Sequence, residues 1–178
     1  MKSSRFIART AKLLSAFLIL FVALNFASCK QEEDSSSFPA GIEELSSDNI
    51  LIGKWIDAYS SVYEISKTEF KNYGEGTYSF SGYEGNNLLI GKVSSDSGYI
   101  YIKYTKSMMP DYSYSTTAPD VGKWYAISYK DLKNNSLSIS GAYKSGGKTS
   151  TESLEEAIKE FTIDNGYFST YSTCSKSN

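Results

Sequence analysis

The stretch Ser136-Leu137-Ser138-Ile139-Ser140 alternates polar and apolar side chains at every position. A period of two residues is typical of a β-strand that has one face on a core and the other on solvent. Residues 99–104 repeat the pattern, because Ile100, Ile102 and Tyr104 fall on one face. Fifteen tyrosines and nine phenylalanines, among many serines and glycines, favour strands and turns over helices in the rest of the chain.

Turn-forming residues separate several such segments. Hairpin connections are predicted at Gly74-Glu75-Gly76, Gly85-Asn86-Asn87, Ser95-Asp96-Ser97-Gly98 and Lys133-Asn134-Asn135. The predicted strands are Leu51–Ala58, Ser61–Ser66, Glu69–Tyr73, Thr77–Tyr83, Leu88–Ser94, Tyr99–Thr105, Lys123–Tyr129, Ser136–Tyr143 and Tyr167–Tyr171. Short strands joined by tight turns indicate an antiparallel all-β domain, either a barrel or a sandwich.

One segment has the period of a helix instead. Leu154, Ala157, Ile158 and Phe161 follow the spacing i, i+3, i+4, i+7, which makes one apolar stripe. The segments 149–152 and 153–156 each fit a capping box, so the helix is expected to start at one of them. The sequence therefore predicts one short amphipathic helix before the last strand.

The beginning of the chain has the layout of a signal sequence. Four basic residues come first, without an acidic one, and a largely apolar run then extends from Leu13 to Ala27. That order is typical of a secretory signal. A membrane-spanning helix needs about 20 apolar residues, which favours a signal over a permanent transmembrane anchor.

Phe26-Ala27-Ser28-Cys29 ends this run and resembles the bacterial lipobox, with Phe26 where that motif usually has Leu. The resemblance implies that residues 1–28 are a lipoprotein signal peptide and that Cys29 receives a diacylglycerol thioether. Residues 29–41 are mostly polar, acidic and rich in serine, which predicts a disordered tether. We expect the lipid on Cys29 to hold the protein in the cell envelope, at the outer membrane. The Lys-Gln-acidic start of the tether is similar to signals for surface display, and a merely solvated linker is the alternative.

The composition excludes several chemistries. Without residues 1–28 the chain has 14 basic residues, all lysines, against 20 acidic ones, a net charge of −6, and no histidine. The absence of histidine excludes Ser-His-Asp and Cys-His nucleophiles and imidazole zinc sites. The absence of arginine removes bidentate clamps for phosphate or carboxylate, and an acidic domain lacks the charge of a nucleic-acid binder. We predict a monomer that is not an enzyme, holds no cofactor or metal and binds no nucleic acid.

With Cys29 consumed by lipid, Cys174 is the remaining thiol. It lies in a Ser/Thr/Lys-rich end, so residues 174–178 are predicted to be a flexible tail. An inert thiol and an intermolecular disulfide are the two alternatives for this cysteine.

Gly53-Lys54-Trp55 opens the first predicted strand and resembles the Gly-x-Trp motif of the lipocalin-like (calycin) families. The resemblance implies that residues 42–173 form an antiparallel up-and-down β-barrel of about eight or nine strands, in which Gly53 and Trp55 are structural. In those families a late basic residue packs across the tryptophan. Here no late arginine exists and only Lys176 is nearby, and the helix precedes the last strand instead of following it.

Residues 106–120 are the longest stretch without clear periodicity, and they include Met108, Met109, Tyr112 and Tyr114. Long loops in compact domains often act as lids or binding loops. Methionine and tyrosine offer adaptable apolar contacts and polar tips. We predict that these four side chains bind a ligand at the mouth of the barrel. The alternative is a loop that only covers the outside of the barrel.

Two functions follow. In the first, a lipid-anchored envelope lipoprotein binds a small apolar or amphipathic ligand in its barrel. This requires a cavity of roughly 300 Å³ or more, and a lumen filled by the protein's own aromatic rings would argue against it. In the second, a surface-exposed protein with a closed barrel and no ligand contacts a host or envelope partner. Tyr99, Tyr101 and Tyr125 would then face outward.

Overall fold

The alternating segments of the sequence form antiparallel strands that pair mainly with their neighbours along the chain. The computed structural model describes residues 38–177. Its elements are β1 (Ile42–Glu44), β2 (Gly53–Asp57), β3 (Ser61–Ile65), β4 (Phe70–Gly74), the short 3₁₀ turn η1 (Gly76–Tyr78), β5 (Phe80–Lys92), β6 (Gly98–Met108), β7 (Tyr114–Ser115), β8 (Trp124–Lys133), β9 (Ser136–Gly141), α2 (Leu154–Glu160) and β10 (Ser172–Ser177).

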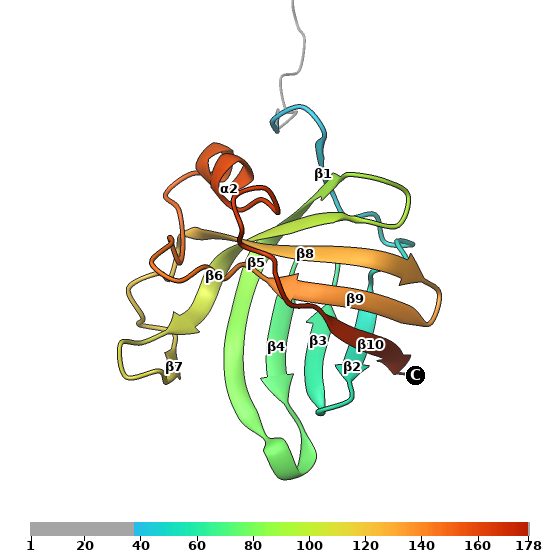
Figure 1. Cartoon of the computed structure of the whole chain (residues 1–178), viewed down its shortest axis with the longest axis horizontal. Coiled ribbons are helices and arrows are strands. Elements are labelled where there is room, and N and C mark those ends of the chain that lie inside the picture. Colours follow the sequence, from blue (N-terminus) through green and yellow to red (C-terminus); the bar gives the residue numbers. More distant parts are fainter. Residues whose placement is uncertain (1–37, 178) are drawn as a thin grey trace, which may run out of the picture. The chain divides into compact units, whose positions relative to one another are not determined.

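Eight of these strands close into a barrel. They follow the order β2-β3-β4-β5-β6-β8-β9-β10, and β10 pairs back onto β2. Strand β1 is added to β5, and β7 is added to the end of β6. In Figure 1, β3 and β4 stand upright with opposite directions, while β8 and β9 lie across the page. The prediction of an antiparallel up-and-down barrel with one short helix before the last strand is confirmed.

Two of the predicted strands are parts of one strand, β5. The segments Thr77–Tyr83 and Leu88–Ser94 were expected as a hairpin around residues 85–87, but Phe80–Lys92 is one continuous strand. Its register against β6 shifts between Asn86 and Leu89, and Asn87 has a left-handed φ of 52°. Asparagine tolerates this conformation in a bulge as well as in a turn, so the local signal was that of a hairpin.

The last strand was also misplaced. Tyr167–Tyr171 is not a strand, and the predicted flexible tail at 174–178 is wrong, because residues 172–177 form β10 between β9 and β2. Cys174 faces the core and is 1% exposed. Backbone hydrogen bonds to two neighbours hold this strand, and those bonds do not require apolar side chains. Burial raises the pKa of the Cys174 thiol to about 12, which keeps it protonated and unreactive.

Trp55 and Lys176 meet where β2 pairs with β10. The indole N–H of Trp55 donates to the Leu51 carbonyl at 2.8 Å, and the ring is fully buried. The Lys176 ammonium lies 5.0 Å from the ring centroid and donates to the Ile50 carbonyl at 2.9 Å. Gly53 has a φ of +141°, and a Cβ there would lie 2.6 Å from the Lys176 Cε. Both Gly53 and Trp55 therefore have structural roles, and the lysine chain occupies the space that the glycine leaves.

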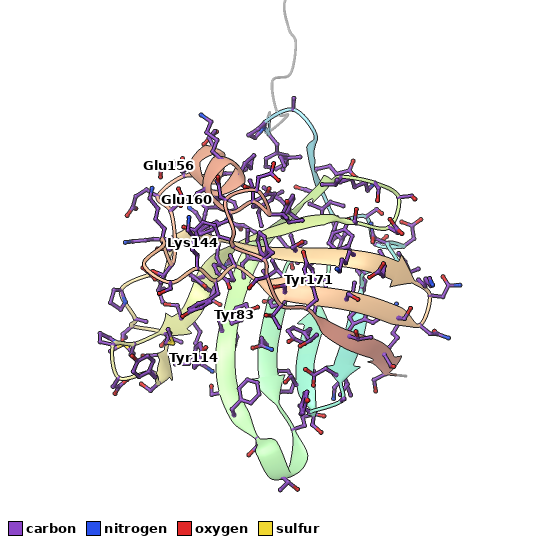
Figure 2. All side chains as sticks on the ribbon, viewed as in Figure 1. Tyr83, Tyr114, Lys144, Glu156, Glu160 and Tyr171 are labelled. Carbon is purple, nitrogen blue, oxygen red and sulfur yellow. The ribbon has the colours of Figure 1, made fainter. Side chains whose placement is uncertain are left out.

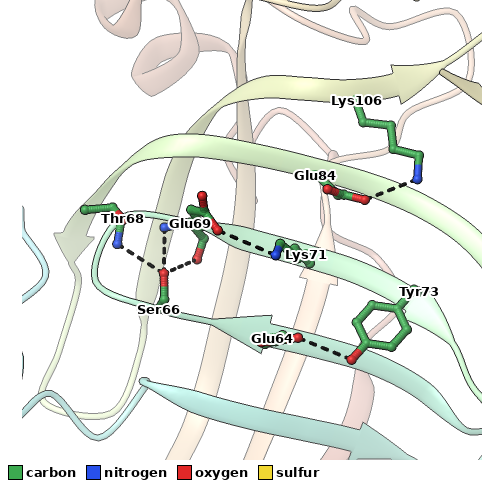
Figure 3. A network of polar contacts seen from close by, with 8 residues as sticks. All are labelled: Glu64, Ser66, Thr68, Glu69, Lys71, Tyr73, Glu84 and Lys106. Atoms are coloured by element: carbon green, nitrogen blue, oxygen red, sulfur yellow. Dashed lines mark hydrogen bonds and ion pairs between the residues drawn. The ribbon is translucent and has the colours of Figure 1, made fainter. Parts of the chain in front are cut away.

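The outer face of the barrel has a row of alternating charges. Lys54, Glu64, Lys71, Glu84 and Lys106 occupy successive cross-strand positions on β2 to β6. Figure 3 shows part of this row, including the ion pair of 3.1 Å between Lys106 and Glu84. Opposite charges at facing positions stabilise one register, because a slip of one residue would break the row and turn its side chains inward.

Helix α2 packs its apolar stripe on the barrel. Leu154, Ala157 and Phe161 are buried, and Phe161 contacts Tyr125 of β8 at 5.9 Å between ring centroids. Of the two predicted capping boxes, the second marks the helix start but is only half formed: Ser153 caps the helix, whereas the Glu156 carboxylate accepts the Glu152 N–H and not that of Ser153. The Ser153 hydroxyl accepts the Glu156 N–H at 3.2 Å.

Residues 1–37 lie outside the described residues, and with them the predicted signal peptide, Cys29 and most of the predicted tether. The last tether residues, 38–41, are described, and Phe38 packs against the core, so the barrel domain begins earlier than residue 42. Within residues 38–177, no helix has the length and apolar character needed to cross a membrane.

Candidate functional site

A cavity of about 430 Å³ lies at one end of the barrel, and we call it the mouth cavity. Its walls come from β5, the last residues of β6, the first of β8, and the connections that follow β6 and β9. In an up-and-down barrel the β6–β8 and β9–β10 connections lie at the same end, which explains why these segments meet. The lining contains five tyrosines, two methionines and two prolines together with smaller residues: Tyr83, Tyr104, Ser107, Met108, Met109, Pro110, Tyr114, Pro119, Asp120, Tyr125, Ala142, Tyr143 and Thr149.

Three of the four predicted ligand-binding residues line this cavity. Met108, Met109 and Tyr114 are in its wall, whereas Tyr112 is not and is 80% exposed. Tyr83 and Tyr114 are labelled in Figure 2, on the side of the barrel where β7 lies in Figure 1. The long loop therefore forms one wall of the cavity, and only Tyr112 turns away from it.

The floor of the mouth cavity is a cluster of aromatic rings. Tyr104 stacks on Tyr125 at 4.8 Å between centroids, and Tyr83 contacts Tyr125 edge-on at 5.3 Å. Deeper in the barrel, Phe70 stacks on Tyr83 at 5.6 Å. Such ring pairs add to the free energy of burial and hold the rings in fixed orientations. The protein's own rings occupy this part of the interior, which argues against the predicted ligand inside the barrel. The cavity above them is at the mouth.

Gly141 of β9 leaves room for two of the phenol groups. A Cβ at this position would lie 2.6 Å from the Tyr125 hydroxyl oxygen and 3.1 Å from that of Tyr83. The Tyr125 hydroxyl donates to the Ala142 carbonyl at 3.0 Å. Two phenol oxygens therefore converge beside β9, which adds polar groups to an otherwise apolar floor.

The phenols of the floor remain uncharged at neutral pH. Burial raises the pKa of Tyr83, Tyr104 and Tyr125 above the usual value for tyrosine, since it removes water from the phenolate form. Burial also raises the pKa of Tyr114 in the wall. These groups can donate hydrogen bonds and present ring faces, but they do not supply charge.

Asp120 is the one charged residue in the lining. Its carboxylate accepts a hydrogen bond from Ser150 at 2.8 Å and lies 3.9 Å from the Lys123 ammonium. That ammonium is closer, at 3.1 Å, to Glu152. Lys123 is thus shared between the carboxylates of Asp120 and Glu152.

Ser107 was not predicted as a site residue. It lines the cavity, is 2% exposed, and its hydroxyl oxygen is the one buried side-chain N or O atom among the described residues without a hydrogen-bond partner. Buried hydroxyls are nearly always hydrogen-bonded in folded proteins. A serine at the start of an aperiodic loop gives no sequence signal of this kind, because the lack of a partner depends on what surrounds it.

The outward tyrosine surface expected for an interaction protein is not formed as predicted. Tyr101 is 2% exposed and Tyr125 is 7% exposed, and Tyr99 is partly buried against the core. Tyr101 lies on β6 where it pairs with β5, and Tyr125 points into the mouth cavity. Residues 99–104 form a strand, as their alternation predicted, but both faces of this strand are covered.

Two other hollows are present among residues 38–177. One of about 640 Å³ is larger than the mouth cavity, but it is more open to solvent and is lined in part by the charged residues Lys54, Glu64 and Lys67. The other, of about 320 Å³, is lined in part by Lys67, Thr68 and Trp124. It also contacts Phe38, the first of the described residues. Within residues 38–177 no three His, Cys, Asp or Glu side chains are grouped as metal ligands would be. The mouth cavity is therefore the candidate site.

Comparisons of the chain with protein-family models, with curated proteins and with solved structures gave no match.

Proposed function

We propose that this chain is a lipid-anchored lipoprotein of the bacterial cell envelope whose barrel binds a small, largely apolar ligand in the mouth cavity. The observation that supports it best is the cavity itself. Its volume of about 430 Å³ is within the range of small-molecule sites, and tyrosine, methionine and proline side chains make most of its wall.

The position of the cavity sets the mode of binding. Met108 and Tyr143 both line it and are exposed, so it is open to solvent on that side. A ligand would enter between these side chains and rest on the rings of Tyr104 and Tyr125. Binding at the mouth needs no opening of the closed barrel, whose eight strands are fully paired.

The anchor is proposed from the sequence around Cys29. Two or three acyl chains on one cysteine would hold the protein stably on a bilayer, because a single chain gives only marginal attachment. Labelling of cells with a radioactive fatty acid tests this part: the wild-type chain should incorporate label and the Cys29→Ala variant should not. Equal labelling of both would refute lipidation at this cysteine.

The Trp55 and Lys176 contact supports the likeness to lipocalin-like barrels, since a late basic residue lies over the tryptophan of Gly-x-Trp. We propose membership of that structural group from this contact together with the strand order. The group is known for binding sites within the barrel, whereas the site proposed here is at its mouth.

A pair of tyrosines in one loop tests ligand binding. The probes are 2-methylnaphthalene and 2-naphthol, and their binding to the full chain in lipid nanodiscs is measured by equilibrium dialysis as the excess over empty nanodiscs. Tyr114→Ala should weaken the binding of both by about tenfold, because it removes a ring from the cavity wall. Tyr112→Ala, the matched control, should have no effect, since Tyr112 lies outside the cavity.

The proposed site is refuted if neither probe binds saturably, or if both tyrosine variants bind the probes as the wild type does. The interaction function would then be the better explanation for an anchored barrel.

A further inference from the structure

Ser107 combines three properties that point to a ligand. It pairs with Ser115 of β7 at the end of β6, and it is one of the residues that line the mouth cavity. It is buried, and no described residue forms a hydrogen bond with its hydroxyl. A buried hydroxyl without a partner destabilises the folded state. A ligand that hydrogen-bonds with Ser107 would recover that lost free energy on binding.

The groups around Ser107 define which polar group the ligand can bring. The lining contains no lysine, and its one charged side chain, Asp120, is negative. A carboxylate ligand would lose its water next to neutral phenols and an aspartate. That loss would not be compensated, because burying an ion without a counter-charge is costly. An uncharged hydroxyl or carbonyl group has no such cost.

The apolar part of the ligand has matching surroundings. Met108 and Met109 follow Ser107 directly, and the stacked rings of Tyr104 and Tyr125 lie on the same cavity. Methionine side chains are unbranched and adapt to the shape of a bound molecule. They can shift to let a polar group reach the buried hydroxyl next to them.

We propose that the mouth cavity takes an uncharged, mainly apolar molecule whose hydroxyl or carbonyl group hydrogen-bonds with Ser107, and that a carboxylate is disfavoured beside this hydroxyl. This inference rests on the proposed function and specifies the class of its ligand. A carbonyl oxygen would accept a hydrogen bond from the Ser107 hydroxyl, and a ligand hydroxyl would donate to it.

Three naphthalene probes of similar size separate the contributions of the hydrogen bond, the apolar contact and the ligand's charge. 2-Naphthol carries an uncharged hydroxyl at pH 7, 2-methylnaphthalene replaces it with a methyl group, and 2-naphthoate carries a carboxylate. Each is dialysed against the full chain in nanodiscs, with empty nanodiscs subtracted. The wild-type chain should bind 2-naphthol about tenfold more tightly than either of the other two, the size of effect expected for one added hydrogen bond.

The Ser107→Ala variant tests the assignment to this hydroxyl. It should bind 2-naphthol about tenfold more weakly than the wild type does, so that 2-naphthol and 2-methylnaphthalene bind about equally. Ser128→Ala is the matched control. Ser128 is equally buried but lies outside the cavity, where it is hydrogen-bonded to Tyr171 at 2.8 Å, so the tenfold preference should persist in that variant.

The inference is overturned if the wild type does not prefer 2-naphthol, if Ser107→Ala keeps the preference, or if 2-naphthoate binds as tightly as 2-naphthol. In each of these cases 2-methylnaphthalene would still bind in a Tyr114-dependent way, so the proposed function would stand. If no probe binds saturably, both are overturned.

Discussion

Replacing Ser107 by alanine should make the ligand-free protein more stable, which is the opposite of what most core substitutions do. The serine hydroxyl is buried without a hydrogen-bond partner among the described residues. Burying such a group costs about 1–3 kcal/mol. Removing one oxygen atom leaves only a small void, so most of that cost is recovered. We expect the free energy of unfolding to rise by about 1 kcal/mol, and Tm by about 3 °C for a domain of this size.

The assay is denaturant unfolding of the full chain, followed by the fluorescence of its two tryptophans, Trp55 and Trp124. Ser128→Ala should shift the transition in the other direction by a similar amount, because it removes the hydrogen bond with Tyr171. The reasoning fails if Ser107→Ala destabilises the protein as much as Ser128→Ala does. That result would mean that the Ser107 hydroxyl already has a partner in the ligand-free protein. A rise in stability together with a loss of 2-naphthol binding would identify a residue retained for function at the expense of stability.

Three further outcomes can be checked on the same protein. Burial raises the pKa of the Cys174 thiol and of the cavity tyrosines, so the unfolded chain releases protons that the folded chain keeps. Stability should be constant from pH 7 to about 8, begin to fall near pH 9 as the unfolded thiol ionises, and fall further above about pH 10, as followed by circular dichroism and phenolate absorbance. Lys176→Met should lower the free energy of unfolding by about 1–2 kcal/mol, because it removes the cation–π contact with Trp55 and the hydrogen bond to the Ile50 carbonyl. The control is Lys159→Met at an exposed position; equal losses of stability in the two variants would contradict this role of Lys176. Cys174 should react with a thiol reagent only after unfolding, because its side chain is buried and its pKa is raised to about 12; rapid labelling of the folded chain would show that β10 opens easily.

Local pattern predicted much of the fold. The alternation in residues 136–140 and 99–104 marked β9 and β6, and the spacing of Leu154, Ala157 and Phe161 marked α2. These patterns are informative because side-chain directions repeat every two residues in a strand and every 3.6 in a helix, so the order of apolar and polar residues indicates the backbone conformation. Asn86 and Asn87 misled the prediction because a bulge inside a strand uses the same residue types as a hairpin turn.

The candidate site was predicted only in part. Met108, Met109 and Tyr114 were found because they lie close together in one stretch of sequence without periodicity, although Met108 ends β6 and Tyr114 begins β7. Tyr83 of β5, Ser107 of β6 and Tyr125 of β8 were missed as members of the same cavity. They come from strands separated by up to 42 positions in the chain, and they meet only because the barrel closes.

The sequence by itself determined that this domain is built of antiparallel strands with one capped helix, and it supplied the tyrosines, the methionines and the lack of arginine that limit its chemistry. Tertiary structure alone decided that residues 172–177 close the barrel, that Cys174 is buried, and that the Ser107 hydroxyl is buried beside the mouth cavity without a partner among the described residues. The physical reason is the range of the interactions. Periodicity fixes which face of its own strand a side chain occupies, whereas burial and hydrogen bonding depend on the register and closure of strands that are distant in the chain.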